Sequence, residues 1–268
     1  MAKPPRVLVI AGSDSSGGAG IQADIKTITM LSGYAMTAIT AVTAQNSVGV
    51  RGVETFPSGF VASQIEACAE DIGIDAIKIG MLSSESIVSE VAETLHAFNL
   101  DKDVPLVIDP VMVATSGHRL IDEAAVQALR TRLLPGASLI TPNLPELELL
   151  WGRKLDGADQ MAEAAIGLAF ELQSPVLAKG GHLEGDIVDV LVNASGELAR
   201  FAGPRILSDH THGTGCTLSS AIAILLGRGQ TLEDAVSQAR QFVRQAIELA
   251  PGYGQGHGPL GHQAVREI

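Results

Sequence analysis

Short apolar runs alternate along this chain with segments of helical periodicity, and this alternation constrains the fold more than any other feature. Runs at residues 6–11, 75–81, 106–110, 138–141 and 176–179 are rich in Val, Ile and Leu and are typical of buried parallel strands. Helical segments separate most of them. The pattern predicts an α/β fold, with a mostly parallel sheet covered by helices on both faces. Because the chain contains no internal repeat or linker, residues 1–268 are predicted to form a single domain.

Residues 36–56 depart from this alternation. Two extended runs, 36–44 and 50–56, meet at the turn formed by residues 45–47 with no helix between them. We expect this segment to form a small β flap over the site. A second hairpin is predicted around residues 193–196, where Asn, Ala, Ser and Gly separate two strand-like runs.

The composition excludes several classes of protein. The formal net charge is −12 and there is no basic cluster, which argues against nucleic acid and anionic membranes as partners. Two cysteines, Cys68 and Cys216, are too few for a disulfide framework, and we interpret Cys68 as a core residue. The start of the chain lacks the features of a signal peptide, and no apolar run approaches the ~18 residues of a membrane span. We therefore expect a cytoplasmic protein.

Polar and glycine residues gather at the carboxyl ends of the predicted strands. Ligands of such folds bind at this edge of the sheet. The residues placed there are Gly12, Met81, Asp109, Asn143, Lys179 and the loop Gly213, Thr214, Gly215 and Cys216. Their repeated occurrence at one edge indicates a binding site more strongly than any single motif.

The loop at residues 211–217 opens an apolar helix. Its glycines let the backbone approach a ligand closely, and the unpaired N–H groups of a first helical turn bind anions such as phosphate. We expect the same first turn to lower the pKa of the Cys216 thiol, so that one loop offers an anion hole and a base for phosphoryl transfer. The alternative is a glycine-rich turn with a small core cysteine.

Asn143 and Glu146 stand three residues apart at another predicted helix start. One interpretation is a capping box; the other directs Asn143 toward phosphate and Glu146 toward a magnesium-bound water. Asp109 adds negative charge at this edge. Lys179 is the cation there and is suited to ATP phosphates, the alternative being a surface lysine.

Two further motifs point to other chemistries. Residues 18–23 fit the dinucleotide pattern G-x-G-x-x-A, but the preceding loop is too long and Gln45 stands where a ribose-binding acid is expected, which disfavours a nicotinamide enzyme. His210, His212 and Cys216 suggest a metal site or a Cys–His nucleophile. A structural zinc needs a fourth ligand, and no C-x-x-C motif accompanies them; a nucleophile pair needs a third group to orient the histidine, which a sequence does not show. Two loop histidines bonded to backbone are the favoured interpretation.

The chain resembles the hydroxymethylpyrimidine and hydroxymethylpyrimidine-phosphate kinases of thiamin biosynthesis, in the ribokinase-like superfamily. The matching stretches span nearly the whole chain in family order: AGSD (11–14), SGGAGIQAD (16–24), TAQN (43–46), KIGM (78–81), DPVM (109–112), TPNLPE (141–146), KGGH (179–182), THGTGCT (211–217) and GHGPL (256–260). The resemblance implies a ribokinase-like three-layer sandwich. It also implies ATP-dependent phosphorylation of a CH₂OH group and then of the monophosphate, giving the pyrophosphate used for thiamin.

The resemblance also implies roles for individual residues. The pyrimidine pocket would be lined by Gly12, Asp24, Gln45, Met81, Val111 and Cys216. ATP and Mg²⁺ would be served by Asp109, Asn143, Glu146, Lys179 and Thr211, with Asp109 and Glu146 reaching the metal through water. Residues 213–216 would form the anion hole, with Cys216 where related sugar kinases carry an aspartate base. A homodimer is implied too. His210 departs from the pattern, since asparagine is expected before Thr211, and this affects the nucleotide contacts.

Two alternatives remain open. Pyridoxal kinases share the superfamily and sometimes the Gly-Thr-Gly-Cys loop, and pyridoxal also carries a ring CH₂OH group. A catalytically inactive ligand-binding regulator is the other; the intact loop at 213–216, with Asn143, Glu146 and Lys179, argues against it.

Overall fold

The protein folds around one mixed β-sheet. In the computed structural model, which describes residues 3–112, 121–183 and 185–266, the strands form a nine-stranded sheet in the order β3-β2-β1-β4-β5-β6-β7-β8-β9. Neighbours from β2 to β7 run parallel, and the two edges are antiparallel. The strands are β1 (Arg6–Asp14), β2 (Tyr34–Asn46), β3 (Gly49–Thr55), β4 (Ala76–Ile79), β5 (Leu106–Ile108), β6 (Leu139–Ile140), β7 (Val176–Ala178), β8 (Ile187–Asn193) and β9 (Gly196–Gly203).

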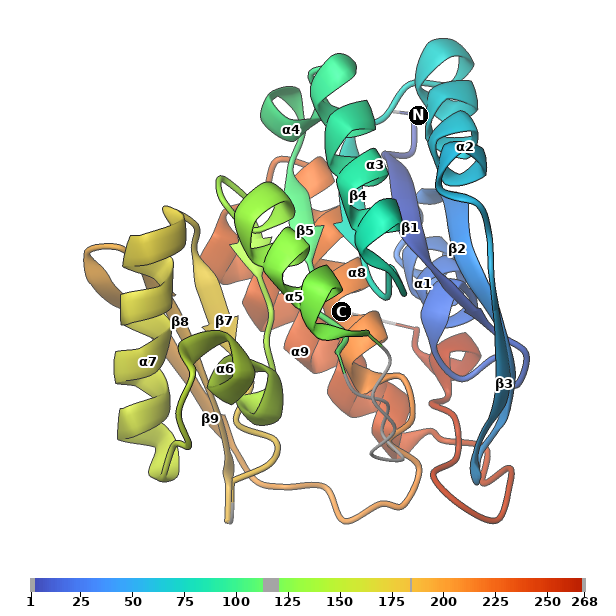
Figure 1. Cartoon of the computed structure of the whole chain (residues 1–268). Helices are drawn as coiled ribbons and strands as arrows, with labels where there is room; N and C mark the ends of the chain where they lie inside the picture. Colours follow the sequence, from blue (N-terminus) through green and yellow to red (C-terminus); the bar gives the residue numbers. More distant parts are fainter. Residues whose placement is uncertain (1–2, 113–120, 184, 267–268) are drawn as a thin grey trace.

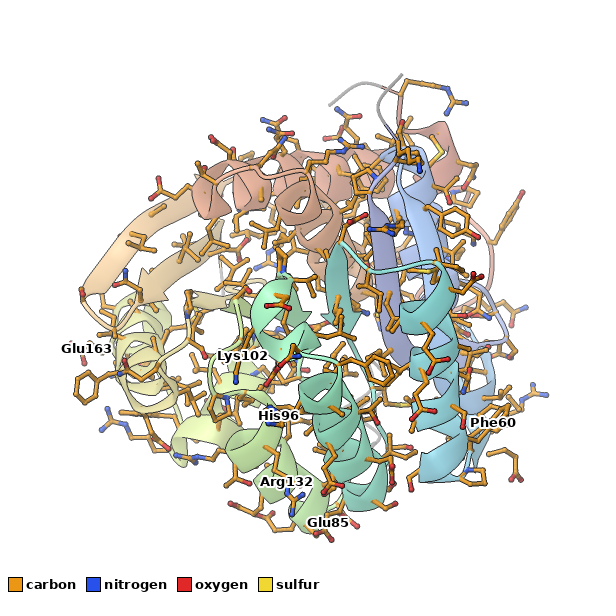
Figure 2. The ribbon with its side chains drawn as sticks, turned by 90° about the horizontal axis from the view of Figure 1, so that it is seen from above. Phe60, Glu85, His96, Lys102, Arg132 and Glu163 are labelled. Atoms are coloured by element: carbon orange, nitrogen blue, oxygen red, sulfur yellow. The ribbon has the colours of Figure 1, made fainter. Side chains whose placement is uncertain are left out.

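Helices cover both faces of this sheet, as the alternation of elements predicts. Figure 1 shows α3, α5 and α6 in front of the sheet and α8 and α9 behind it, and Figure 2 shows the same layers from above. The helices are α1 (Gly20–Met30), α2 (Ser58–Asp71), α3 (Glu85–Ala97), α4 (Leu100–Asp103), α5 (Glu123–Ala128), a π-helical turn η1 (Leu129–Leu133), α6 (Leu144–Trp151), α7 (Gly157–Leu172), α8 (Thr214–Gly227), α9 (Leu232–Glu248) and a 3₁₀ turn η2 (His262–Ala264).

The central strand β1 shows why the sheet needs cover on both faces. Leu8 and Ile10 belong to the core beneath α2 to α7, whereas Val7 and Val9 belong to the core beneath α1, α8 and α9. Successive side chains of a strand point to opposite faces, so a continuous apolar run must be buried on both. Charged side chains such as Glu85 and Arg132 lie on the outer side of the helical layer (Figure 2).

Local signals set several helix starts. Ser84 accepts a hydrogen bond from Ile87 N (3.3 Å) at the start of α3, and Thr231 accepts one from Asp234 N (3.2 Å) at the start of α9. Cys68 is half-buried and packs against the core, as expected. Among the described residues, none of the helices is long and apolar enough to cross a bilayer.

The segment predicted as a flap is continuous with the sheet. Strand β2 pairs parallel with β1, from Tyr34 opposite Arg6 to Thr43 opposite Asp14. Its second half pairs with β3, with a register shift between Ala44 and Gln45. A bulge of this kind redirects the following side chain. The hairpin therefore extends beyond the sheet edge and carries Gln45 toward the site.

Candidate active site

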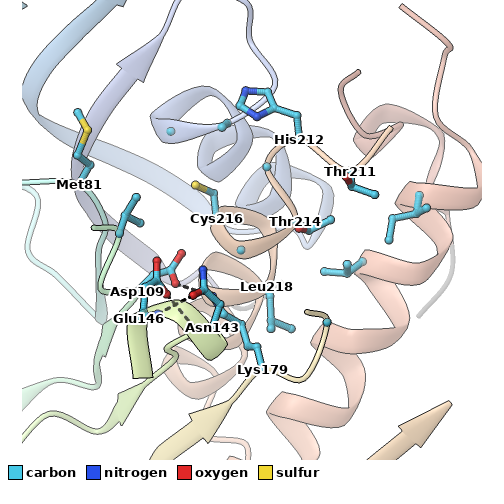
Figure 3. A pocket seen from close by; sticks show the side chains of 18 of the residues that line it. Met81, Asp109, Asn143, Glu146, Lys179, Thr211, His212, Thr214, Cys216 and Leu218 are labelled. Carbon is cyan, nitrogen blue, oxygen red and sulfur yellow. Dashed lines mark hydrogen bonds and ion pairs between the residues drawn. The ribbon is translucent and has the colours of Figure 1, made fainter. Parts of the chain in front are cut away.

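A cavity of about 630 Å³ opens at the carboxyl ends of β1, β4 and β5, a volume typical of small-ligand sites. It reaches from the β2–β3 hairpin to the start of α8 and the start of α6 (Figure 3). The sequence-predicted residues that line it are Gly12, Gln45, Met81, Asp109, Val111, Asn143, Glu146, Lys179, Thr211, Gly213, Thr214, Gly215 and Cys216. Asp24 is the predicted residue that does not line it.

The first turn of α8 faces this cavity. Gly213 precedes the helix with φ 91°, and a Cβ at this position would overlap the carbonyl oxygen of Gly18. In the described chain, no side-chain hydrogen bond caps α8 and no acidic residue lies in its first turn. The positive end of the helix is therefore available to an anion in the cavity.

A lysine–carboxylate pair lies beside that helix start. Lys179 Nζ donates to Asp109 Oδ1 at 2.8 Å, and Thr141 Oγ1 donates to the same oxygen at 3.1 Å. A Cβ on Gly215 would come within 3.2 Å of Asp109 Oδ2 and 3.3 Å of Lys179 Nζ. Glycine at this position thus lets the ion pair lie against the helix backbone.

Asn143 and Glu146 form the predicted capping box at the start of α6. Glu146 N donates to Asn143 Oδ1 (2.9 Å), and Asn143 N donates to Glu146 Oε2 (2.8 Å). Both residues also line the cavity, so the structural and functional interpretations apply together. Burial, with the nearby Asp109 carboxylate, raises the pKa of Glu146 to about 7 although Lys179 opposes the shift.

These carboxylates fit a magnesium ion held through water. The Asp109 carboxylate lies close enough to disfavour negative charge on Glu146, a repulsion that a divalent cation relieves. Among the described residues, no group of three or more His, Cys, Asp and Glu side chains is arranged to hold a metal by itself. Mg²⁺ commonly takes one or two carboxylates and completes its shell with water and phosphate oxygens, so this pair suits it.

Cys216 lines the cavity, but its predicted ionisation is wrong. Burial raises the pKa of the thiol to about 11, and the carboxylates of Asp24 and Asp109 add to the shift. The Lys78 ammonium and the Gly20 N–H favour the thiolate but do not outweigh burial. A position in a first helical turn therefore does not determine a thiol's pKa when burial opposes it.

Asp24 lies behind the cavity wall and not in the wall itself, which corrects its predicted place in the pyrimidine pocket. Its carboxylate is fully buried and accepts hydrogen bonds from Lys78 Nζ (2.9 and 3.0 Å) and Ser220 Oγ (2.6 Å). Lys78 does line the cavity, and sequence reasoning missed it. Its position inside an apolar strand is the signal that was available, since a lysine there requires a buried partner.

Asp14 also lines the cavity and was not predicted as a site residue from the sequence. Its carboxylate accepts hydrogen bonds from Ser16 N (2.8 Å) and Ala19 N (2.8 Å) and lies 2.8 Å from His212 Nε2. Burial alone would raise the pKa of Asp14, but these bonds lower it to about 2. His212 therefore contacts a side chain at the cavity wall, contrary to the expectation of a backbone-bonded loop histidine.

The other loop histidine, His210, does not line the cavity; it packs against Gly258. Its departure from the family pattern therefore falls outside the cavity wall. A metal site of His210, His212 and Cys216 does not form in the part of the chain that the structure describes.

The end of the cavity formed by α8 and α9 carries apolar side chains. Leu218 of α8 and Val243 and Ile247 of α9 line it together with Ile206. The Arg240–Asp189 pair, with Nε and Oδ2 2.7 Å apart, borders this end. Sequence reasoning missed Leu218, Val243, Ile247 and Ile206, because apolar side chains resemble ordinary core positions until the helices are assembled.

The chain is similar to known kinases over nearly its full length. The family model described as phosphomethylpyrimidine kinase matches residues 14–261. A thiamine biosynthesis bifunctional protein, ThiED, from Geobacter sulfurreducens is 48% identical over 97% of this chain, which spans 53% of that relative. A hydroxymethylpyrimidine/phosphomethylpyrimidine kinase from Streptomyces coelicolor is 46% identical, with 97% of this chain and 94% of the relative covered.

A solved structure is similar as well. The pyridoxal kinase from Staphylococcus aureus in complex with AMP-PCP and pyridoxal is 33% identical and superposes with a TM-score of 0.88, covering 100% of this chain and 96% of that one. The predicted α/β fold with helices on both faces is thereby confirmed.

Proposed function

The chain belongs to the phosphomethylpyrimidine kinase family, and on this premise we propose that it phosphorylates 4-amino-5-hydroxymethyl-2-methylpyrimidine and then the resulting monophosphate, using ATP. The product is the pyrophosphate used in thiamin biosynthesis. The observation that carries the proposal is one cavity with two chemically different regions: the Gln45 amide on one side, and the α8 helix start with Asp109 and Lys179 on the other.

The side of the cavity at α8 is suited to the negatively charged phosphate groups. The helix start and Lys179 supply positive charge for the transferred phosphoryl group, as phosphoryl transfer requires. Thr211, in the loop that leads into α8, also lines the cavity. The apolar end near Val243 and Ile247 suits a nucleotide base. Binding of AMP-PCP by the similar pyridoxal kinase supports this assignment of ATP.

Asp109 and Glu146 would hold Mg²⁺ through water. The ion would neutralise charge on the ATP phosphates when bound. Asn143 keeps the Glu146 carboxylate in place through the capping box and presents its own side chain to the same region of the cavity.

Cys216 is the group we assign to the hydroxyl proton of the first step. In the view of Figure 3 it lies between His212 and the Asp109–Lys179 pair. The second phosphorylation needs no base, because a phosphate monoester is already largely ionised near pH 7. The first phosphorylation therefore depends on the Cys216 side chain as a proton acceptor, and the second does not.

The proposal is tested by ATP turnover with each candidate alcohol, with the products identified by mass. We expect turnover with the hydroxymethylpyrimidine and with its monophosphate. Gln45→Ala is expected to lower kcat/KM for the pyrimidine by about 5- to 150-fold, corresponding to about 1–3 kcal/mol for unpaired polar groups. Absence of pyrimidine turnover in the wild-type protein would refute the proposal.

Pyridoxal is the second candidate substrate. The likeness of this chain to a pyridoxal kinase that binds pyridoxal favours it, but relatives of higher sequence identity are named hydroxymethylpyrimidine/phosphomethylpyrimidine kinases. The same turnover assay decides, since a pyridoxal kinase would use pyridoxal with the higher kcat/KM.

We further infer a single-domain homodimer that acts in the cytoplasm. The sheet that joins all strands of the described chain supports one domain. Val42, Val48 and Val53 of the β2–β3 hairpin are 40%, 68% and 40% exposed and offer an apolar surface for a second subunit. The mass in solution tests the dimer.

A further inference from the structure

The side-chain amide of Gln45 lies between two polar neighbours. One of its terminal atoms is 3.2 Å from His212 Nε2, and the other is 3.2 Å from Thr43 Oγ1. The structure has the amide Nε2 on the His212 side and Oε1 on the Thr43 side. The two ends of an amide have nearly the same size and shape, so hydrogen bonding decides between its two orientations.

His212 Nε2 cannot accept a hydrogen bond from Gln45. The same Nε2 atom lies 2.8 Å from Asp14 Oδ2. Asp14 stays ionised at neutral pH and can only accept hydrogen bonds. A bare Nε2 lone pair facing this carboxylate would be repelled, so Nε2 carries the proton in the neutral as well as in the charged ring. A protonated Nε2 has no lone pair for an amide N–H, so the Gln45 atom beside it is favoured to be the acceptor, Oε1.

Thr43 leads to the same orientation independently. Its hydroxyl lies 3.1 Å from the carbonyl oxygen of Ser13, which can only accept. The single hydroxyl proton is thus donated to Ser13, and the oxygen lone pairs of Thr43 face Gln45. Thr43 is 5% exposed, so this proton has few alternatives. The Gln45 atom on this side is favoured to be the donor, Nε2.

We propose that the Asp14–His212 pair and Thr43 hold the Gln45 amide with Oε1 toward His212 and Nε2 toward Thr43, and that this orientation selects an aminopyrimidine and directs its hydroxymethyl group toward α8. This inference rests on the proposed function. Each end of the amide keeps one free hydrogen-bonding position, an acceptor on the His212 side and a donor on the Thr43 side. A 4-aminopyrimidine offers the complement, an amino donor beside a ring-nitrogen acceptor.

The order of acceptor and donor also sets the direction of the substrate. The 4-amino group would bind at Oε1, on the side of His212, which directly precedes the α8 helix start. The hydroxymethyl group is on the neighbouring ring carbon and is therefore directed to the first turn of α8, where Cys216 lies. The opposite amide orientation would direct it away. A 4-oxopyrimidine, with a carbonyl beside a ring N–H, reverses the pattern and is rejected.

The test compares kcat/KM for 4-amino-5-hydroxymethyl-2-methylpyrimidine with that for its 4-oxo analogue. Thr43→Val and His212→Phe are each expected to lower the amino-to-oxo ratio by about 5- to 50-fold, and the double variant to lower it further, with KM for ATP unchanged. Thr43→Ser keeps the hydroxyl and is expected to keep the amino-to-oxo ratio of the wild-type protein.

Thr40→Val is the matched control. Thr40 is on the same strand and its hydroxyl donates to Met81 O (2.7 Å), but it does not contact Gln45. This variant is expected to lower the melting temperature and leave the ratio unchanged. An unchanged ratio in both Thr43→Val and His212→Phe, with both proteins folded by thermal melts, would overturn the inference. A wild-type protein that phosphorylates neither pyrimidine would overturn the proposed function together with it, so the two failures are distinguishable.

Discussion

Lys78 and Asp24 form an ion pair from which water is excluded: Nζ lies 2.9 Å from Oδ2, and both side chains are 0% exposed. Burial by itself would lower the pKa of Lys78, but the acidic groups around it, Asp24 first among them, together outweigh burial and raise the pKa above the ordinary value. The ammonium therefore stays charged at the cavity wall, where Cys216 and Asp109 are its electrostatic neighbours. This pair anchors β4, α1 and, through Ser220, α8 to one another.

Asp24→Asn should destabilise the protein far more than it weakens pyrimidine binding. The change leaves the Lys78 ammonium buried without a counter-charge, which costs about 3–5 kcal/mol. Asp75→Asn is the control, because the Arg6–Asp75 pair is 39% and 34% exposed and its loss should cost about 1 kcal/mol or less. Urea denaturation of both variants measures the difference. Equal destabilisation would contradict the argument.

Cys216→Ala should lower kcat for the first phosphorylation by about 10²–10⁴ and leave KM for ATP nearly unchanged, since the helix backbone remains. Cys216→Asp should recover part of the rate. Because burial raises the thiol pKa to about 11, the thiolate fraction of the wild-type enzyme grows across pH 7 to 9.5. The first-step kcat should rise with it, and the alanine variant should not show this rise. An alanine variant with wild-type kcat would leave Cys216 as a packing residue.

Glu146→Gln should change how stability depends on pH. The folded-state pKa of about 7 lies above the ordinary 4.5, so the folded protein holds this proton more tightly than the unfolded chain does. The resulting stability is fully present below pH 4.5 and is lost as the pH rises through 7. Glutamine keeps the shape and the capping bond without the charge. At pH 8 without Mg²⁺, the variant should melt at a higher temperature than the wild type.

The same variant should need more Mg²⁺ for half-maximal turnover, because one of the two carboxylates near the metal is gone. Asn143→Ala is the matched control for the capping box and should lose about 1 kcal/mol of stability at every pH. If Glu146→Gln shows an unchanged Mg²⁺ requirement, Glu146 serves only to cap α6.

Gly213→Ala should abolish activity and destabilise the protein by at least about 2 kcal/mol, since φ is 91° and the new Cβ would overlap the carbonyl of Gly18. Gly59→Ala in α2 is the control: a Cβ added there would meet no atom of the described residues within 4 Å, and alanine favours the helix by about 0.4–1 kcal/mol. Thermal melts should therefore move in opposite directions. Similar melting temperatures for the two variants would show that the turn at Gly213 tolerates a side chain.

Much of the fold could be predicted because its signals are local. The buried-type run in β1, the Ser84 and Thr231 caps and the turn at Gly196 each depend on a few neighbouring residues. The same holds for the residues at the carboxyl edge of the sheet, since strand ends can be read from the sequence and a parallel sheet brings those ends together. Gly12, Asp109, Asn143, Lys179 and the loop before α8 were placed correctly at the cavity by this reasoning.

Only the tertiary structure decided how these side chains ionise and pair. Asp14 meets His212 across 198 residues, and Asp24 meets Ser220 across 196. The thiol of Cys216 has a raised pKa where its helix position alone predicts a lowered one, because burial outweighs the helix start. The chain by itself determined the order of the elements and the edge of the sheet that carries the chemistry. Desolvation and hydrogen bonding act between residues distant in sequence, so charge state, the orientation of Gln45 and the burial of Asp24 were set only when the layers packed together.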